Sequence, residues 1–330
     1  MSNVFVRALL ATIALSIGLA NTTSASAQEY PTAGKPIRIV VPFTAGGSSD
    51  FVARTLANKL TDTMKHSVIV DNRPGGNTLI GAEHVAKSPP DGHTLFLVGV
   101  ITHASSPALA KKTPIDMVKD FAFITNAVES PLVVVVNPKV PANTLPEFIA
   151  YAKANPGKVN YGSAGIGNTL HLAGEQFAAL TGTKLNHIPY KGASQAQVDL
   201  IGGSIQAMFD LVQTPLKQIQ AGNLRALAVT SGERVPMLAA TPTTAEAGTP
   251  GFRFSARIGL AAPAGTPPAV MARLHQEITA ALALPDVRTQ FLNQAMIPAP
   301  SESPDAFQKL MQSEVERLGA LIRAAGIQPE

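Results

Sequence analysis

The chain has 330 residues, with 26 lysines and arginines against 22 acidic residues, 45% hydrophobic residues and no cysteine. The absence of cysteine excludes disulfide scaffolds, thiol nucleophiles, cysteine-ligated metals and iron–sulfur clusters. A net charge of +4 without any block of lysine or arginine argues against nucleic acid as a partner. The length predicts two domains, or one divided fold, stabilised by packing alone.

The first 27 residues have the pattern of a secretory signal. Arg7 supplies a positive start, an apolar stretch runs from Ala8 to Ala20, and Ala25 to Ala27 forms an A-x-A cleavage site before Gln28. The apolar stretch is short for a membrane span, and no later hydrophobic run reaches that length. We therefore expect an exported protein that is cleaved near Ala27–Gln28.

Short β-rich runs alternate with helical patterns from Pro36 onward. Apolar residues recur every four positions after the first run, which is typical of a helix with one buried face. This βαβαβ spacing favours a parallel sheet with helices on both faces. The predicted strands are Ile37–Val41, Val68–Val70 and Thr94–Val98, and the predicted helices are one with Val52, Leu56 and Leu60 on its buried face and one over Thr78–Ala86.

A second set of strands and helices begins near residue 132. Thr144 to Glu147 has capping-box spacing and predicts the start of a helix that ends near Asn155. The next strand leads into a second glycine-rich loop and a helix, so the first strand–loop–helix arrangement is repeated. The predicted strands are Leu132–Val136, Lys158–Tyr161, Leu185–Ile188, Ile205–Phe209 and Leu224–Val229; the later helices carry Ala173, Phe177 and Leu180, stop at Gly202 and Gly222, and span Pro267–Leu284 and Pro304–Ala325.

Two apolar segments, Val128–Val136 and Arg257–Ala262, lie where the two sets would meet. If the C-terminal helices pack back on the first set, two strands must cross between the sets. We therefore predict an α/β protein with two lobes and a central cleft that opens about a hinge. Lobe 1 is expected to comprise residues 28–129 and 256–330, and lobe 2 residues 130–255.

The loop from Phe43 to Asp50 combines a strand end, two glycines and a helix start. Unpaired amides at a helix N-terminus carry partial positive charge, and glycine lets an anion approach them closely. Two interpretations fit this loop. It binds a carboxylate, or it is a simple turn in which Ser48, Ser49 or Asp50 caps the helix.

The loop from Gly162 to Thr169 has the same design, with Ser163, Asn168 and Thr169 as additional side-chain donors. It matches no nucleotide-binding motif, because Leu170 stands where the dinucleotide fingerprint requires glycine. It also fails the G-x-S-x-G pattern of serine hydrolases. A nucleotide cofactor and an exposed nucleophile are therefore disfavoured.

Seven histidines are scattered along the chain without metal-ligand spacing, so a metal site is not expected. His171 falls in the first turn after the second glycine loop, where it either faces the cleft or has a capping or solvated role. Asp210 ends a predicted strand and either reaches the cleft or caps the turn from Leu211 to Pro215.

Eight motifs, in order from Pro36 to near the C-terminus, resemble those of the Bug family, the periplasmic substrate-binding proteins of tripartite tricarboxylate transporters. These motifs are Pro36–Phe43, Gly46–Ser48 with Asp50, Asn72–Gly75, Pro90–Gly92, Tyr161–Gly165, Pro189–Ala193, Leu227–Thr230 and Ala262–Pro267. The resemblance implies a two-lobed, type II Venus-flytrap fold, a periplasmic location, no catalysis and no cofactor. It also implies a monomer that works with the membrane subunits of such a transporter.

The same resemblance implies that a small organic carboxylate is held between the two glycine loops, partly through ordered waters. A dicarboxylate or an aromatic acid is expected, and Asp210 matches an acidic position of the family. A carboxylate ligand would be repelled by Asp50 or Asp210 unless a water or an amine intervened, so either aspartate could select amino-bearing ligands. The implied ligand-binding residues are Phe43, Ala45, Gly46, Gly47, Ser48 and Asp50 in the first loop, with Ser163, Ala164, Gly167, Asn168 and Thr169 in the second.

One position departs from the family. Members commonly carry tryptophan where this chain has Arg257, and the chain has no tryptophan. If Arg257 faces the cleft, its planar guanidinium could pair bidentately with a second ligand carboxylate. The alternative is that Arg257 points to solvent and covers apolar surface.

Two other functions are compatible with the sequence. The same fold could serve as the ligand-binding subunit of a signalling system, which the sequence alone does not separate from uptake. An exported hydrolase would use Ser163, His171 and Asp210, but the chain lacks the sharp turn that would expose the serine.

Overall fold

The computed structural model describes residues 30–110 and 113–329. The predicted signal, residues 1–27, lies outside these residues. The chain divides into two compact units, residues 1–32 and 33–330. In the first unit the described residues, 30–32, form no helix or strand. The second unit is described below, and no described helix is both long and apolar enough to cross a bilayer.

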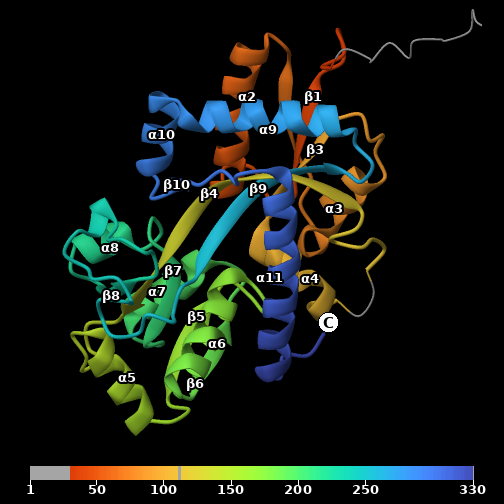
Figure 1. The fold of residues 1–330 in the computed structure, drawn as a ribbon. Coiled ribbons are helices and arrows are strands. Elements are labelled where there is room, and N and C mark those ends of the chain that lie inside the picture. Colours follow the sequence, from red (N-terminus) through yellow and green to blue (C-terminus); the bar gives the residue numbers. More distant parts are fainter. Residues whose placement is uncertain (1–29, 111–112, 330) are drawn as a thin grey trace, which may run out of the picture. The chain divides into compact units, whose positions relative to one another are not determined.

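Ten strands form one mixed sheet, in the order β2-β1-β3-β9-β4-β7-β5-β6, with β8 and β10 also paired to β4 (Figure 1). We call β2, β1 and β3 the first half of the sheet and β7, β5 and β6 the second half. The strands are parallel within each half, as the βαβ spacing predicts. Their bounds are β1 Ile37–Val41, β2 Val68–Asn72, β3 Thr94–Gly99, β4 Phe121–Val136, β5 Val159–Ser163, β6 Leu185–Pro189, β7 Ala207–Leu211, β8 Arg225–Val229, β9 Ser255–Pro263 and β10 Ile297–Pro298.

Helices connect the strands and cover the sheet, and the long C-terminal helix α11 contacts β4, α4 and α6. The α-helices are α2 Ser48–Met64, α3 Leu79–Ala86, α4 Val100–Leu109, α5 Leu145–Ala154, α6 Thr169–Thr181, α7 Ala193–Gly202, α8 Leu216–Gln220, α9 Pro268–Ala283, α10 Pro285–Leu292 and α11 Pro304–Ala324. Short 3₁₀ turns lie at Gly76–Thr78 and Pro236–Leu238.

The two predicted crossing strands are β4 and β9, which run antiparallel to each other between the halves (Figure 1). β9 pairs with β3 of the first half, and β4 pairs with β7 of the second. The two-lobed α/β class with hinge strands is therefore confirmed. The boundaries predicted after residues 129 and 255 stay a prediction, because residues 33–330 form a single compact unit.

The capping box is present in part: the Thr144 hydroxyl accepts from the Glu147 amide at 3.3 Å, and the Glu147 carboxylate accepts from the Asn143 amide. Helices α4 and α10, strand β10 and the first part of β4 were not predicted. Helix α4 follows β3 without a loop and contains Pro107, so its sequence carries no start or stop signal. Strand β4 begins at Phe121, before the predicted start at Leu132. Its first part contains Thr125 and Asn126, which are buried although they are polar, so the apolar pattern that predicts a strand is interrupted there.

The hinge strands pack on helix α11 through a glycine. A Cβ atom on Gly259 of β9 would lie 2.4 Å from the Phe307 ring and 2.7 Å from the Thr125 carbonyl oxygen. Beside it, β4 is irregular between Phe123 and Val128. There the Asn126 side chain donates to the Ala299 carbonyl at 2.8 Å and the Asn126 amide donates to the Ser301 hydroxyl at 3.2 Å, whereas the buried Asn126 Oδ1 has no partner.

We predict that Gly259→Ala destabilises the fold by about 1–3 kcal/mol, because the added methyl group overpacks the contact between β9 and α11. Urea unfolding followed by circular dichroism measures this change. Gly202→Ala is the matched control, since a Cβ there meets nothing within 4 Å. Equal stability of the Gly259→Ala protein and the wild type would contradict the packing argument.

Candidate functional site

The register of the sheet brings the carboxyl ends of both sets of parallel strands together. The last residue of β3, Gly99, pairs with Ile258, which pairs with Val128 of β4. The last residue of β7, Leu211, pairs with Leu132 of β4. Because β3 runs along β4 and β7 runs against it, the two ends point toward the same short segment of β4. Ligands of open α/β sheets bind at such carboxyl ends.

The first glycine loop follows β1 and leads into α2. Gly47 is the N-cap of α2 and makes no side-chain cap, so the alternative in which Ser48, Ser49 or Asp50 caps the helix is wrong. Residues 44–48 are exposed, and Gly46 has a φ of +84°, which favours glycine. The Phe43 ring instead packs against Gly99. Uncapped amides are therefore available at the start of α2.

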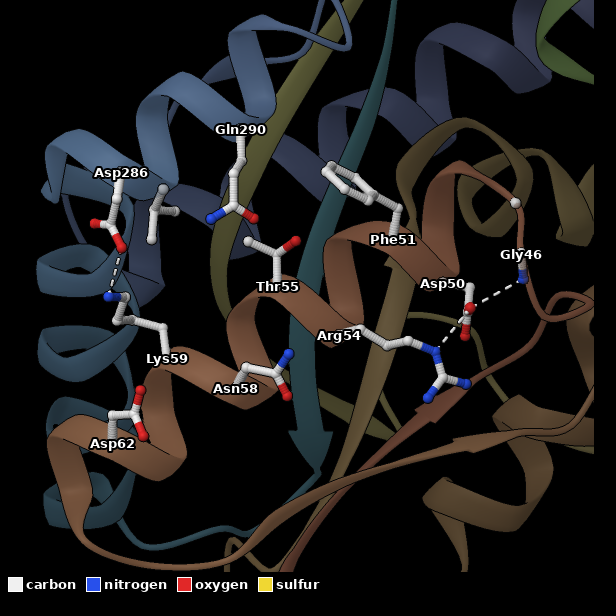
Figure 2. Close-up of a pocket in the computed structure, with 12 residues that line it drawn as sticks. Gly46, Asp50, Phe51, Arg54, Thr55, Asn58, Lys59, Asp62, Asp286 and Gln290 are labelled. Carbon is white, nitrogen blue, oxygen red and sulfur yellow. Dashed lines mark hydrogen bonds and ion pairs between the residues drawn. The ribbon is translucent and has the colours of Figure 1, made fainter.

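Asp50 is buried and organises this loop. Its Oδ2 atom accepts from the Gly46 amide and the Arg54 Nε, each at 2.9 Å, and its Oδ1 accepts from Asn72 Nδ2 at 2.9 Å (Figure 2). The hydrogen bond from Arg54, with those from Gly46 and Asn72, lowers the Asp50 pKa to about 2. Asp50 is therefore ionised at neutral pH and already has three partners within the protein.

The second glycine loop joins β5 to α6 and is held by Ser163 and His171. The Ser163 hydroxyl accepts from the Gly165 amide at 3.1 Å, and His171 Nδ1 accepts from the Gly167 amide at 2.8 Å. The Asn168 side chain caps α6 by accepting from the His171 amide, and Thr169 begins the helix. Ala164 packs on the core of the second half. The predicted residues of this loop thus lie together, and two of them fix its backbone.

A second histidine, His187 of β6, belongs to the same cluster and was missed by sequence reasoning. Its Nε2 lies 2.7 Å from the Ser163 hydroxyl, and its ring stacks on that of His171 with 3.7 Å between centroids. Burial lowers the pKa of His187 to about 4, and burial together with His187 lowers that of His171 to about 3. Both rings are therefore neutral at physiological pH. Only the pairing of β5 with β6 brings His187 here.

We extend the names of the two halves to the helices, so that α4 and α11 belong to the first half of the molecule and α6 to the second. The second loop contacts the first half at Leu109. A Cβ atom on Gly167 would lie 2.2 Å from the Leu109 Cδ1 atom of α4, and Gly167 has a φ of +74°. A cavity of about 470 Å³ lies beside this contact. It is lined by residues of the first half, among them Leu79 and Leu109, and by Ile166 from the second loop. A ligand in this space would contact both halves.

A larger cavity of about 530 Å³ borders the first loop at Gly46, Gly47 and Asp50 (Figure 2). Its other lining residues come from α2 and α10, which Lys59 and Asp286 join by an ion pair at 2.6 Å. A ligand here would contact one half of the molecule and would not favour closure, since closure requires contacts with both. This cavity is the weaker candidate for the site.

Asp210 lies at the end of β7, on the edge that faces the first half. It is 1% exposed; its Oδ1 accepts from the Leu211 amide at 2.8 Å, and its Oδ2 has no hydrogen-bond partner. Burial raises the Asp210 pKa to about 7, although the Leu211 amide and the Thr214 hydroxyl act in the opposite direction. The hydrogen bond from the Leu211 amide corresponds to the predicted turn-capping role of Asp210. Its Oδ2 is buried at the same edge and has no hydrogen-bond partner.

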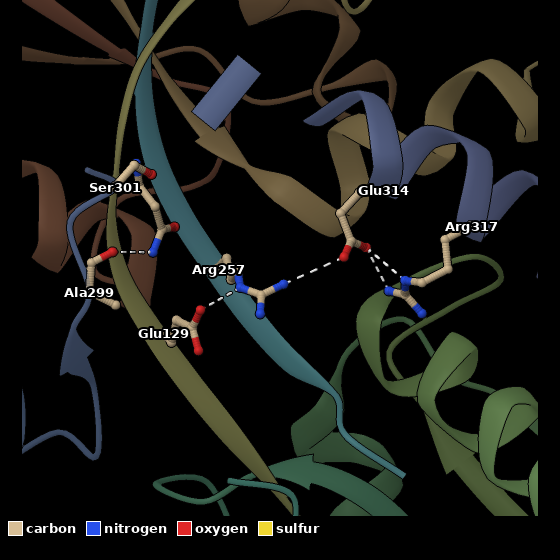
Figure 3. A network of polar contacts seen from close by, with 7 residues as sticks. Glu129, Arg257, Ala299, Ser301, Glu314 and Arg317 are labelled. Atoms are coloured by element: carbon tan, nitrogen blue, oxygen red, sulfur yellow. Dashed lines mark hydrogen bonds and ion pairs between the residues drawn. The ribbon is translucent and has the colours of Figure 1, made fainter. Parts of the chain in front are cut away.

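Arg257 lies on β9, and its guanidinium pairs with two carboxylates of the protein (Figure 3). Its Nε donates to Glu129 at 2.5 Å, and its Nη1 lies 3.5 Å from Glu314. The side chain is 25% exposed. Arg257, which stands where the sequence analysis expects tryptophan, therefore places a positive charge at the hinge. A ligand carboxylate would compete with Glu129 and Glu314 for its guanidinium.

The three residues of the hydrolase hypothesis are not joined by hydrogen bonds within the described part of the chain. Ser163 is fully buried and contacts His187, whereas His171 Nδ1 is occupied by the Gly167 amide. Asp210 bonds to the Leu211 amide. Among residues 30–110 and 113–329, no group of three or more histidines and acids is placed to hold a metal ion.

We predict that Asp210→Asn stabilises the protein increasingly between pH 4 and pH 7. The native carboxyl keeps its proton until about pH 7, whereas the unfolded one loses it near 3.8, so the wild type loses stability as pH rises through this window. The difference in unfolding free energy should grow by up to about 4 kcal/mol. Urea unfolding of both proteins from pH 4 to 8 measures it, and a constant difference would contradict the buried, raised carboxyl.

The comparisons with known proteins agree with this architecture. Residues 52–327 match the model of the tripartite tricarboxylate transporter family receptor. The protein BugT of Bordetella pertussis is 37% identical over 96% of this chain and 97% of its own length. The structure of R. palustris Rpa4515 with adipate has 31% identity and a TM-score of 0.78, covering 92% of this chain and all of that one. MatC of Rhodopseudomonas palustris, with bound malate, has 29% identity and a TM-score of 0.73 over 88% of this chain and 99% of its own. The chain therefore belongs to the tripartite tricarboxylate transporter receptor family, whose members include the Bug proteins.

Proposed function

We propose that this chain is a periplasmic receptor that captures a small organic carboxylate between its two halves and delivers it to the membrane subunits of a tripartite transporter. The observation that supports the proposal is that the carboxyl ends of the two sets of parallel strands, β1 and β3 in one half and β5 and β7 in the other, point toward the same segment of β4. Both loops contain glycines, and the missing side chains let an anion approach the backbone amides. The protein acts as a monomer and performs no catalysis.

The binding energy comes mainly from amide donors. Each hydrogen bond to a charged carboxylate contributes about 1.5–3 kcal/mol. Several such bonds, less the cost of ordering the ligand and the loops, correspond to micromolar affinity, or about −8 kcal/mol. The first loop supplies the uncapped start of α2, and Gly47 and Ser48 contribute there. The second supplies the segment from Ala164 to Asn168.

The ligand class is a dicarboxylate or an aromatic acid. Adipate and malate, bound in Rpa4515 and MatC, are both dicarboxylates. The cavity that both halves line carries Leu79, Leu109 and Ile166, which suit the carbon chain or ring of such a ligand. The unpartnered Oδ2 of Asp210 suits a donor group on the ligand or an ordered water.

We predict micromolar binding of at least one acid from a panel of adipate, malate, glutamate and benzoate. Isothermal titration calorimetry and thermal shift measure it on the mature chain at pH 7. Each binding event raises the midpoint of unfolding, because the ligand binds only the folded state. No heat and no thermal shift with any organic acid would contradict the proposed function.

Gly167→Ala is expected to weaken binding of such an acid about ten-fold or more, because the methyl group collides with Leu109 and moves the second loop. Gly157→Ala is the matched control. It has the same backbone strain, with a φ of +73°, but its Cβ meets nothing within 4 Å. Gly167→Ala should lose more stability than Gly157→Ala, because its methyl group alone meets a neighbouring side chain, and equal affinities of the two proteins would show that the second loop does not bind the acid.

A further inference from the structure

Five side chains form a continuous polar network across the hinge, and Figure 3 shows four of them, Glu129, Arg257, Glu314 and Arg317. We call it the hinge network. Glu129 of β4 and Glu314 of α11 both pair with Arg257 of β9. Arg317 of α11 donates to the other oxygen of Glu314 through Nε at 3.1 Å and Nη2 at 2.6 Å. Its Nη1 then donates to Gln176 Oε1 of α6 at 2.8 Å, so the network links both hinge strands to the second half.

Arg317 is the member of this network that reaches α6. Its guanidinium also lies 5.3 Å from the centre of the Phe254 ring, which comes directly before β9. The Glu314 side chain is 8% exposed and that of Arg317 38%, so the pair is shielded from solvent on the Glu314 side. The Arg317 guanidinium is held by two hydrogen bonds to Glu314 and by the face of the Phe254 ring, so its orientation is fixed. Its Nη1 therefore lies at a defined place relative to Gln176.

Helix α6 is the element that carries the second glycine loop. The first half therefore holds this helix at two levels. Near its start, Gly167 contacts Leu109 of α4, and further along, Gln176 contacts Arg317 of α11. Together with the packing of α11 on α6, these two contacts hold both the position and the tilt of the helix relative to the first half.

We propose that Arg317, through Gln176, is a positioning residue that holds α6 and the second glycine loop in the arrangement that binds the ligand. This inference rests on the proposed function, because it concerns the same two loops. A receptor whose binding-competent arrangement is only partly populated loses apparent affinity in proportion to that fraction. The hinge network raises the fraction, and no residue of it needs to touch the ligand.

Gln176→Ala tests this most cleanly, because it removes the hydrogen bond between Arg317 and α6 and leaves the packing of α11 on α6 and every ion pair of the network in place. Arg317→Met is the second variant. Arg273→Met is the matched control, since Arg273 pairs with Glu277 within α9 and bridges no elements. The chain has no cysteine, so Thr63→Cys on α2 and Lys153→Cys on α5, both exposed, allow spin labels at two defined places.

Pulse dipolar spectroscopy on the ligand-free, labelled protein should show a broader and longer distance distribution for Gln176→Ala and Arg317→Met than for the parent. Arg273→Met should leave the distribution unchanged. The double variant should show no more change than Arg317→Met alone, because that substitution already removes the bond to Gln176. An unchanged distribution in Gln176→Ala overturns the inference whatever the ligand assays give.

Titration with adipate, or with whichever acid of the panel binds, adds the functional readout. Apparent affinity should fall about three-fold or more in Gln176→Ala, with the added acid restoring the parent distance distribution. Equal affinity despite a shifted distribution overturns the inference and leaves the proposed function standing. Absence of binding by the parent protein itself is the separate result that contradicts the proposed function.

Discussion

The fold depends on one strand that forms hydrogen bonds in both halves of the molecule. β4 pairs with β9 along Phe121–Pro131 and with β7 from Leu132 onward. Since a strand fixes the register of each neighbour, the two halves cannot slide independently along it. Their parallel strands therefore end opposite each other, on either side of the same segment of β4. β4 and β9 are the strands that join the two halves.

The backbones of the two glycine loops are held in place by different chemical groups. The first is held by an ionised carboxylate, Asp50, which collects an amide, a guanidinium and a carboxamide. The second is held by neutral groups, the Ser163 hydroxyl and the stacked rings of His171 and His187. In both loops the side chains are used to fix the backbone. Neither Asp50 nor the two histidines change charge between pH 5 and 8, because the Asp50 pKa is about 2 and the pKa values of His171 and His187 are about 3 and about 4.

The charged side chains near the hinge serve the protein's own geometry. Arg257 and Arg317 are matched by Glu129 and Glu314, so a region with several charges has little net attraction for an anion. Buried or half-buried ion pairs contribute specificity of arrangement more than stability, because desolvation offsets much of their attraction. Here they join four elements that are far apart in the sequence: β4, β9, α11 and α6.

The sequence by itself determined the fold class, the hinge strands and the positions of both glycine loops, because these follow from local patterns. Alternating apolar runs, the Thr144 cap and the glycines at strand ends each act within a few residues. Helix α4 and the first part of β4 were not predicted, since their local sequence signals are weak and their formation depends on burial in the folded protein.

Only the tertiary structure decided what the candidate side chains do. It paired Asp50 with Asn72 and Arg257 with Glu129 and Glu314, and it placed His187 and Leu109 beside the second loop. Each of these contacts joins residues whose proximity depends on strand pairing or helix packing. Hydrogen bonds and ion pairs act over about 3–4 Å, so a side chain's role is set by which elements the fold places within that reach.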